Sequence, residues 1–398
     1  MIYLFIAAFL LFLSFHYDVN RNVNGKERWY TFSFIILVCL AGLRYRIGID
    51  SLNYNYVFYH ETENIFNVLG TLSITEYPLW KLLNSAIYTI GGRFYMVQFI
   101  ESAFVNILVF SYIKKHSNYI FTCVFLYFIW MYPGYNFEEM KQTFAVAISL
   151  YANDYMLGKK YLKGVLLFSI ACMFHFAAII VALSSLLTFL KLDLKGLVLL
   201  VVAFWIGGFI QDYYSYYMFL FDSDEFLNER VEIYMESERF GMLTGRNLNF
   251  FIVHLLPIVF PLTAYFYSKN HGRDRVLLKL EPFFVLAVLY FILGSRLGIA
   301  YRYINFYAVY FILFLSQAYV DFIRNDRTDF KVIKAVIPSV LFVLYILTTY
   351  IGYNGDMDRY HKFYPYSSII EKSVDPEREY VYNTHSYGRV NPPNENEY

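Results

Sequence analysis

Charged residues are scarce in this 398-residue chain. Asp, Glu, Lys and Arg together make up only 16% of it, whereas hydrophobic residues make up 58%. A soluble domain is usually about a quarter charged, so a chain this apolar could not cover its surface in water without aggregating. Lipid accepts an apolar exterior, and the composition therefore predicts an integral membrane protein.

The chain also has few cysteines, almost no net charge and none of the common motifs of soluble enzymes. The three cysteines lie inside apolar runs, which indicates small core residues and not disulfides or a metal site. The net charge of +1 gives no reason to expect a nucleic-acid partner. The chain contains no P-loop, G-x-G-x-x-G, H-E-x-x-H, G-x-S-x-G or C-x-x-C motif. We therefore expect no nucleotide, no other cofactor and no catalytic metal.

Apolar runs recur along most of the chain. They lie near 1–16, 29–43, 94–113, 119–133, 138–157, 162–175, 176–190, 195–210, 248–267, 276–294, 303–320 and 332–350. They predict an all-α, polytopic transmembrane bundle of about 12 spans, within about 11–14. The amphipathic stretch Tyr77–Ile90 is predicted to be an interfacial or re-entrant helix. The first run has no basic n-region, so we interpret it as a transmembrane helix and not as a cleaved signal peptide.

Basic segments predict the orientation of these spans. The positive-inside rule would place six of them in the cytoplasm: VNRNVNGKER, IKKHSN, GKKYLK, KLDLK, SKNHGRDR and IRNDRTDFKVIK. We therefore predict a transmembrane domain over 1–350, with external loops at 44–76 and 211–247. The tail over 351–398 would lie outside the cytoplasm. One long helix through 162–190 would invert every later span.

Ionisable residues at the predicted outer helix ends are candidates for function, because such groups cost roughly 3 kcal/mol each at membrane depth. In LRYRIGIDSLNYNYVFYHE, Arg44 and Arg46 precede Asp50, and Tyr54 and Tyr56 follow it. Two guanidinium groups at one helix end suit a phosphate or diphosphate, because each can donate two hydrogen bonds. The structural alternative is an Arg–Asp pair that closes a loop, with snorkelling at the interface.

Two further groups follow in the chain. NFEEMKQTFAVAISL opens a helix with Glu138 and Glu139, and Lys141 and Gln142 lie one turn deeper. Acids in a first turn also complement the helix dipole, which is a structural alternative for Glu138. His175, within ACMFHFAAII, has the chemistry of a general acid or base, but a buried histidine can equally hydrogen-bond a backbone carbonyl.

The last candidates lie in the second half of the chain. In GSRLGIAYRYINFY, Arg296 and Arg302 flank a short turn beside Tyr301. A cation–aromatic cluster at the outer rim suits an anionic or sugar ligand, and anchoring at the membrane interface is the alternative. The long loop 211–247, with Arg246 near its end, has the length of a lid over a substrate groove.

These groups, in this order, resemble the EpsG family of bacterial polysaccharide polymerases, which are related to the Wzy O-antigen polymerases. The matching features are R-x-R-x-G-x-D-x-x-x-Y from Arg44 to Tyr54, EYPLWKLLNSAIYTIGG, MKQTFAVAISL, FHFAAII, YRYINFY and YPYSSII. The likeness covers most of the chain. The family usually has Arg before the Gln of the third motif. This chain has Lys141 there, which keeps the charge but loses the bidentate fork.

The resemblance implies a multi-pass protein of the bacterial cytoplasmic membrane that makes O-antigen, capsule or exopolysaccharide. Its substrate would be an oligosaccharide repeat unit on polyprenyl diphosphate, joined to the next unit at the outer leaflet. Its partners would be membrane lipid, a chain-length regulator and a flippase. This reaction suggests diphosphate binding by Arg44, Arg46, Lys141, Arg246 and Arg302. It suggests acid–base roles for Asp50, His175 and Glu139, and sugar binding by Tyr54, Tyr56, Gln142 and Tyr301.

Other functions fit the sequence in part. A ligase or membrane O-acetyltransferase of the same pathway would also be polytopic, and the ligase would use the same lipid donor. A flippase or other transporter for the lipid-linked unit is expected to show repeat symmetry and charges near the bilayer midplane. Here the charged groups are predicted at the outer rim, which favours an enzyme.

Overall fold

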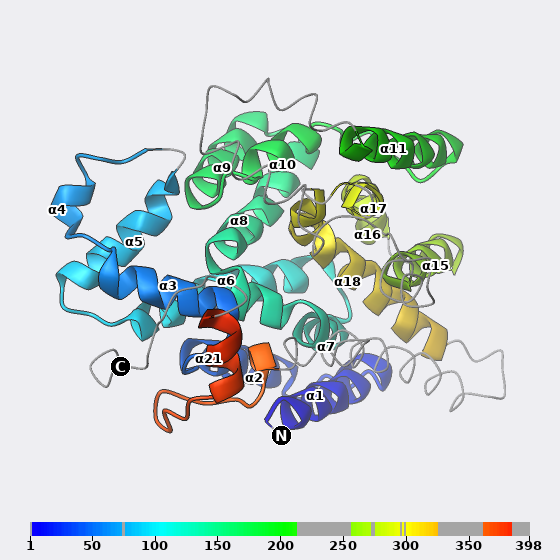
Figure 1. The fold of residues 1–398 in the computed structure, drawn as a ribbon. Helices are drawn as coiled ribbons and strands as arrows, with labels where there is room; N and C mark the ends of the chain where they lie inside the picture. Colours follow the sequence, from blue (N-terminus) through cyan, green and yellow to red (C-terminus); the bar gives the residue numbers. More distant parts are fainter. Residues whose placement is uncertain are drawn as a thin grey trace. The chain divides into compact units, whose positions relative to one another are not determined.

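The computed structural model describes residues 2–73, 76–212, 256–271, 275–294, 297, 300–324 and 361–383. These residues form helices, turns and irregular segments without a β-strand, which confirms the all-α prediction (Figure 1). The helices are α1 Ile2–Leu13, α2 Lys26–Gly42, α3 Ile49–His60, α4 Ile65–Val68, α5 Pro78–Thr89, α6 Phe94–His116, α7 Ile120–Trp130, α8 Met140–Leu157, α9 Tyr161–Phe174, α10 Ala178–Ser184, α11 Leu194–Asp212, α15 Leu256–His271, α16 Arg275–Leu278, α17 Glu281–Gly294, α18 Tyr301–Arg324 and α21 Pro376–Val381. Two π-helical turns are η1 Ser14–Val19 and η3 Gly134–Glu138.

The described helices support a membrane protein. By length and apolar composition, Ile2–Val19, Phe94–His116 and Arg302–Arg324 are long enough to cross a bilayer. Shorter apolar helices are Ile120–Trp130, Tyr161–Phe174, Leu194–Ile210 and Glu281–Gly294. The predicted count of about 12 spans is not confirmed by these helices. The predicted run 332–350 lies outside the described residues.

Two segments that the sequence left uncertain have defined helices. The stretch 162–190 is broken, because α9 ends at Phe174 and α10 begins at Ala178, with His175 extended between them (φ −155°, ψ 121°). The predicted external loop 44–76 contains α3 and α4, and Tyr77–Ile90 contains α5. Of the predicted loop 211–247, only the first two residues are described, at the end of α11.

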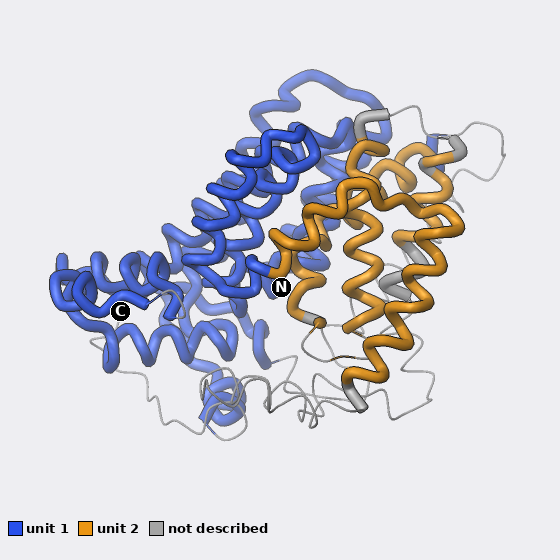
Figure 2. Tube along the Cα trace, turned by 90° about the horizontal axis from the view of Figure 1, so that it is seen from above, with its two compact units in different colours: residues 1–179, 322–398 blue, residues 180–321 orange. Residues whose placement is uncertain are grey.

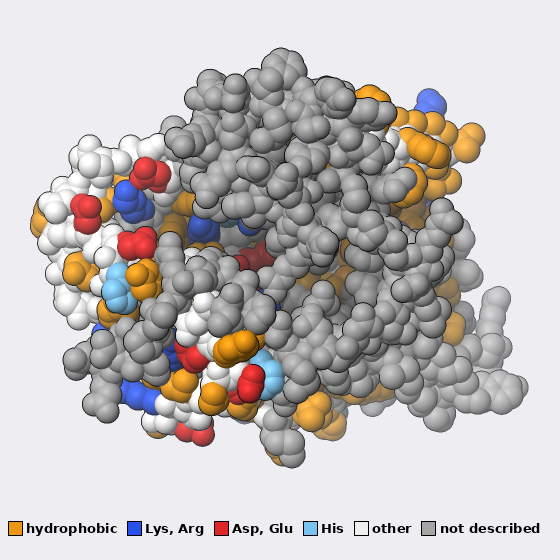
Figure 3. Space-filling view, in the orientation of Figure 1, with side chains coloured by type: hydrophobic (Ala, Val, Ile, Leu, Met, Phe, Trp, Pro, Cys, Tyr) orange, Lys and Arg blue, Asp and Glu red, His pale blue; other side chains and the backbone are white. Residues whose placement is uncertain are grey.

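The chain divides into two compact units (Figure 2). Unit 1 comprises residues 1–179 and 322–398, and unit 2 comprises residues 180–321. In unit 1, α8 packs against α9 and α6, and α6 packs against α2. In unit 2, α11 packs against α17, and its outer face is apolar, with exposed Val201, Trp205 and Phe209 (Figure 3). Such a face suits lipid.

Both π-helical turns supply an acid that caps a different helix. From η1, the Asp18 carboxylate accepts hydrogen bonds from Thr122 N (2.7 Å) and Thr122 Oγ1 (2.9 Å), at the start of α7. From η3, Glu138 accepts the amides of Ile49 (3.0 Å) and Asp50 (2.8 Å), at the start of α3. Each acid thus satisfies amides that a helix N-terminus leaves without an internal partner. Glu138 therefore complements the dipole of α3, whereas the sequence suggested its own helix.

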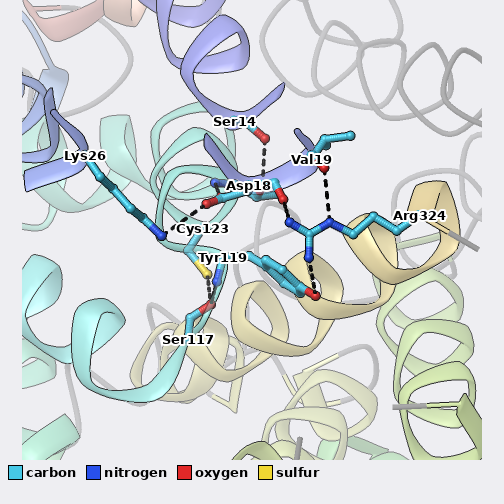
Figure 4. A network of polar contacts seen from close by, with 9 residues as sticks. Ser14, Asp18, Val19, Lys26, Ser117, Tyr119, Cys123 and Arg324 are labelled. Carbon is cyan, nitrogen blue, oxygen red and sulfur yellow. Dashed lines mark hydrogen bonds and ion pairs between the residues drawn. The ribbon is translucent and has the colours of Figure 1, made fainter. Parts of the chain in front are cut away.

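The end of η1 also anchors the end of α18 (Figure 4). The Arg324 guanidinium donates to the backbone oxygens of Asp18 and Val19 and to the Tyr119 hydroxyl (3.2 Å). The Lys26 ammonium lies 4.0 Å from the other Asp18 carboxylate oxygen. Cationic donors at a helix C-terminus complement its exposed carbonyls, so this network joins η1, the start of α7 and the last turn of α18.

Gly48 allows a close approach between α3 and η3. Its backbone has φ +92°, a conformation that favours glycine, and a Cβ built there would lie 2.2 Å from Phe137 O. The contact brings the start of α3 against the turn whose Glu138 caps it. A glycine and a carboxylate thus fix one helix start together.

Asp18→Ala is expected to destabilise the protein by about 1–3 kcal/mol, because the buried Thr122 amide would lose its acceptor. Thermal unfolding of the detergent-solubilised protein measures this effect. Glu27→Ala is the control, since Glu27 pairs with Lys114 on an exposed surface and should leave the melting temperature almost unchanged. An Asp18→Ala protein that melts with the parent would contradict the capping role.

Gly48→Ala is expected to lower both the membrane abundance and the melting temperature of the protein, because the added Cβ collides with a backbone oxygen in a left-handed conformation. Gly134→Ala is the matched control on the facing turn, because its Cβ would meet nothing within 4 Å. The control should retain parental abundance. Equal behaviour of the two variants would show that the two segments separate easily.

Candidate functional site

Five side chains from four regions of the sequence gather at one place. We call Tyr54, Tyr77, Trp80, Lys141 and His175 the Lys141 cluster. The Lys141 Nζ atom lies 4.1 Å from the ring centroid of Tyr77 and 5.7 Å from that of Tyr54. The rings of Tyr77 and His175 are stacked at 5.3 Å, and those of Tyr54 and Trp80 meet edge to face at 5.3 Å. One cation is therefore held among aromatic rings, an arrangement that attracts both.

Separate elements bring these side chains together. Tyr54 lies on α3, Trp80 on α5 and Lys141 at the start of α8, while His175 occupies the break after α9. Since α9 packs against both α5 and α8, the end of α9 delivers His175 to the other residues. The sequence predicted Lys141, His175 and Tyr54 as separate candidates, and the structure brings all three together.

Tyr77 has a strained backbone. Its φ of +57° and ψ of +63° lie in the left-handed region, which costs a non-glycine residue roughly 1–2 kcal/mol. Pro78 then begins α5 at its first position, where a missing amide is tolerated. Backbone strain of this kind persists only where surrounding contacts hold it, and it concentrates at functional sites. Here the contacts are those of the ring with Lys141 and His175.

An apolar layer supports the cluster. Trp80, Met140 and Phe144 belong to one buried hydrophobic group, and Phe174 stacks on Phe144 at 4.5 Å. Lys141, Tyr54 and Tyr77 themselves are only partly buried. The cation thus lies above a low-dielectric layer, which strengthens its electrostatic interactions with any anionic ligand.

His175 has an identifiable tautomer. The residue is 4% exposed, and its Nδ1 atom accepts a hydrogen bond from Ala177 N at 3.2 Å. A ring nitrogen that accepts carries no proton, so the neutral imidazole has its proton on Nε2. In this state Nε2 is a donor. In this tautomer the Nε2–H group can give a hydrogen bond to an oxygen.

The arginines of the first motif make contacts within the chain. Arg44 is fully buried, and its guanidinium donates to Ala41 O (2.6 Å) and Ser51 Oγ (3.1 Å) and lies 5.4 Å from the Phe137 ring centroid. Arg46 is 2% exposed, and it makes two 2.7 Å hydrogen bonds to the carboxylate of Glu379. The structural alternative was an Arg–Asp pair that closes a loop, whereas the structure pairs Arg46 with Glu379 of a distant segment.

The other predicted residues are more dispersed. Asp50 and Glu139 are half-buried at the starts of α3 and α8, and Gln142 is buried. Tyr56 stacks on His60 at 4.3 Å. Two residues along an α-helix turn through about 200°, so Tyr54 and Tyr56 face different sides of α3.

Three predicted residues belong to unit 2 or to the undescribed part. Arg302 is partly buried on α18. Tyr301 opens the same helix, and its side chain lies outside the description, as does all of Arg246. Within the described ranges, no group of three or more His, Cys, Asp or Glu residues has the arrangement of a metal site.

Sequence reasoning missed Tyr77, Trp80 and Glu379. Both aromatics lie in the quoted EYPLWKLLNSAIYTIGG segment, where a bulky residue directly before a proline was a usable signal. The sequence around Glu379 contains no signal that connects this residue to Arg46. Charged side chains of both signs lie on the face around α3, α5 and α21 (Figure 3).

Comparison with known proteins agrees with the motifs. Residues 27–368 match the model of the EpsG family, and no curated protein or solved structure matches. EpsG-like proteins are polysaccharide polymerases of the Wzy type. Since the match covers most of the chain, and the described helices are those of a membrane protein, this protein belongs to the EpsG family of polysaccharide polymerase-type membrane proteins.

Proposed function

We propose that this protein joins oligosaccharide repeat units carried on polyprenyl diphosphate at the outer leaflet of the bacterial cytoplasmic membrane. The family supports a polysaccharide polymerase. The observation that carries the finer proposal is the Lys141 cluster, where a cation and a histidine donor meet three aromatic rings. The cation and the histidine donor suit a diphosphate, and sugar rings can stack on the aromatic side chains.

The proposed reaction breaks one bond and forms one. A hydroxyl oxygen of the incoming lipid-linked unit attacks the anomeric carbon at the end of the growing chain. The bond from that carbon to the diphosphate oxygen breaks, and the lipid diphosphate leaves with the electron pair. The hydroxyl proton passes to a base. Negative charge therefore grows on the diphosphate in the transition state, and preorganised positive groups lower the barrier.

Residue roles follow from these requirements. Lys141 would stabilise the leaving diphosphate as a point charge, and His175 would donate from Nε2 to one of its oxygens. Tyr54 and Trp80 would stack on the sugar nearest the diphosphate. Asp50, in the first turn of α3, is the candidate base.

For Arg302, a partly buried cation on α18, the proposal of diphosphate binding comes from the sequence motif. Arg246 is a third candidate on sequence grounds alone. Arg44 and Arg46 have partners within the chain, and we assign them to shaping the start of α3 and not to the first contact with substrate.

Lys141→Ala is expected to abolish long surface polymer, with a loss in rate of about 10²–10³-fold, because one group that stabilises the leaving charge is removed. Lys141→Arg should retain polymer, since it keeps the charge. Electrophoresis of surface glycans, with immunoblotting of the membrane fraction, measures both effects. Lys81→Ala is the matched control, because Lys81 is exposed on α5 and pairs with Glu76.

Two outcomes would count against this function. Polymer of parental length in the Lys141→Ala strain would remove the cluster from the mechanism. Accumulation of single repeat units on the cytoplasmic leaflet after gene deletion would indicate a flippase, whereas a polymerase deletion leaves single units at the cell surface.

Two substitutions of Tyr77 distinguish the role of its ring from that of its hydroxyl. Tyr77→Phe should keep polymer, because the ring still contacts Lys141 and stacks on His175. Tyr77→Leu should shorten or remove polymer while the protein remains in the membrane. The same glycan and immunoblot measurements apply. Equal polymer in the Leu and Phe variants would show that the aromatic face has no role.

A further inference from the structure

The C-terminal segment lies along the arginine motif. We call residues 43–48 the arginine segment and residues 361–383 the C-terminal latch. The two run antiparallel around an isolated bridge between Arg44 and Ser368. Three backbone hydrogen bonds of 2.9 Å connect them: Tyr45 N to Ser367 O, Gly48 N to Lys362 O and Ile369 N to Leu43 O. The latch thus supplies partners for backbone groups that a loop would otherwise present to solvent.

Arg378 fastens the latch from inside. It is 1% exposed, and its guanidinium donates to three backbone oxygens: His361 (2.6 Å), Arg46 (2.8 Å) and Pro365 (2.9 Å). One of these acceptors belongs to the arginine segment and two belong to the latch. Burial lowers the pKa of Arg378, and the nearby carboxylates of Asp375 and Glu379 oppose that shift. A single buried cation therefore binds the backbone of both the arginine segment and the C-terminal latch.

A side-chain ion pair between Arg46 and Glu379 also connects the arginine segment to the C-terminal latch. Both guanidinium–carboxylate distances are 2.7 Å, with 1% of the Arg46 side chain and 12% of the Glu379 side chain exposed. Glu379 lies on α21, directly after Arg378, and Figure 1 shows α21 beside the start of α3. This bidentate geometry uses the planar fork of arginine fully.

We propose that the C-terminal latch is a positioning element of the polymerase site, and that Arg46 acts through Glu379 and not by contacting substrate. The arginine segment leads directly into α3, which carries Asp50 and Tyr54. Gly48 and Glu138 hold the start of α3 against η3, and the latch holds the preceding residues. Loss of the latch would free the entry to α3 and displace Tyr54 from Lys141.

The first test concerns geometry and is independent of the proposed function. Leu43 and Ile369 share a backbone hydrogen bond, and paired antiparallel residues of this kind have Cα atoms about 5.5 Å apart, within disulfide range. Leu43→Cys with Ile369→Cys, in a background where Cys39, Cys123 and Cys172 are alanine, should form an intramolecular crosslink under mild oxidation. Leu43→Cys with Ile370→Cys should crosslink less. Absence of the first crosslink in membranes would overturn the latch.

The second test asks where the charge of Arg46 acts. Glu379→Arg and Arg46→Glu should each remove long surface polymer, because each places like charges together. The reciprocal double variant should restore polymer, since a pair that only positions can be reversed. Glu377→Arg is the matched control on the exposed side of α21 and should leave polymer unchanged. Polymer in the Glu379→Arg single variant at parental length would overturn the proposal.

A double variant without either charge provides a test if the charge-reversed double variant does not accumulate in the membrane. Arg46→Gln with Glu379→Gln removes both charges and keeps a hydrogen-bonding pair of similar size. The proposal expects polymer from this variant at more than half of the parental amount. Loss of polymer from a protein with parental abundance and an intact 43–369 crosslink would overturn it, because Arg46 would then be needed for substrate. The polymerase role itself fails separately, if deletion of the gene leaves polymer unchanged.

Discussion

A polar group without a partner is costly in an interior that excludes water, and this constraint governs the structure of unit 1. Helix starts carry amides that the helix cannot satisfy, and buried arginines carry charge that needs acceptors. The chain meets both needs with residues from distant elements. Asp18 accepts a hydrogen bond from an amide at the start of α7, and Glu138 does the same at the start of α3. Arg324 donates to the carbonyls at the end of η1. The polar contacts are therefore also the contacts that fix the arrangement of the helices.

The same constraint places chemistry at helix ends. Lys141 lies at the start of α8 and His175 lies after α9, where the backbone has left the helical path. A residue in a break can turn its side chain toward a neighbouring element, as His175 does toward Tyr77. The buried aromatic layer of Phe144 and Phe174 then keeps that neighbourhood dry on one side. Strain at Tyr77 belongs to this pattern, because the strained residue places its ring against both a cation and an imidazole.

Much of this could be predicted from the sequence. Average apolar content predicted the membrane and the all-α class, since burial in lipid acts on whole segments. The order of short motifs predicted the family and brought Lys141, His175 and Tyr54 forward. Helices α3 and α4 were missed because their polar residues resemble those of a loop. The partners of Arg44 and Arg46 were missed for a different reason: local spacing indicates which charges exist, and it cannot indicate which distant carboxylate or carbonyl satisfies them.

The separation between Arg46 and Glu379 has a consequence for how the protein is made. They are 333 residues apart, almost the full length of the chain. Ribosomes add about 5–20 residues per second, so the arginine segment is translated roughly 17–67 s before its acid. During that interval α1 to α18 can enter the membrane while the entry to α3 is still unlocked. The Arg46–Glu379 contact can therefore form only after α21 is translated, and a nascent chain that stops before α21 lacks it.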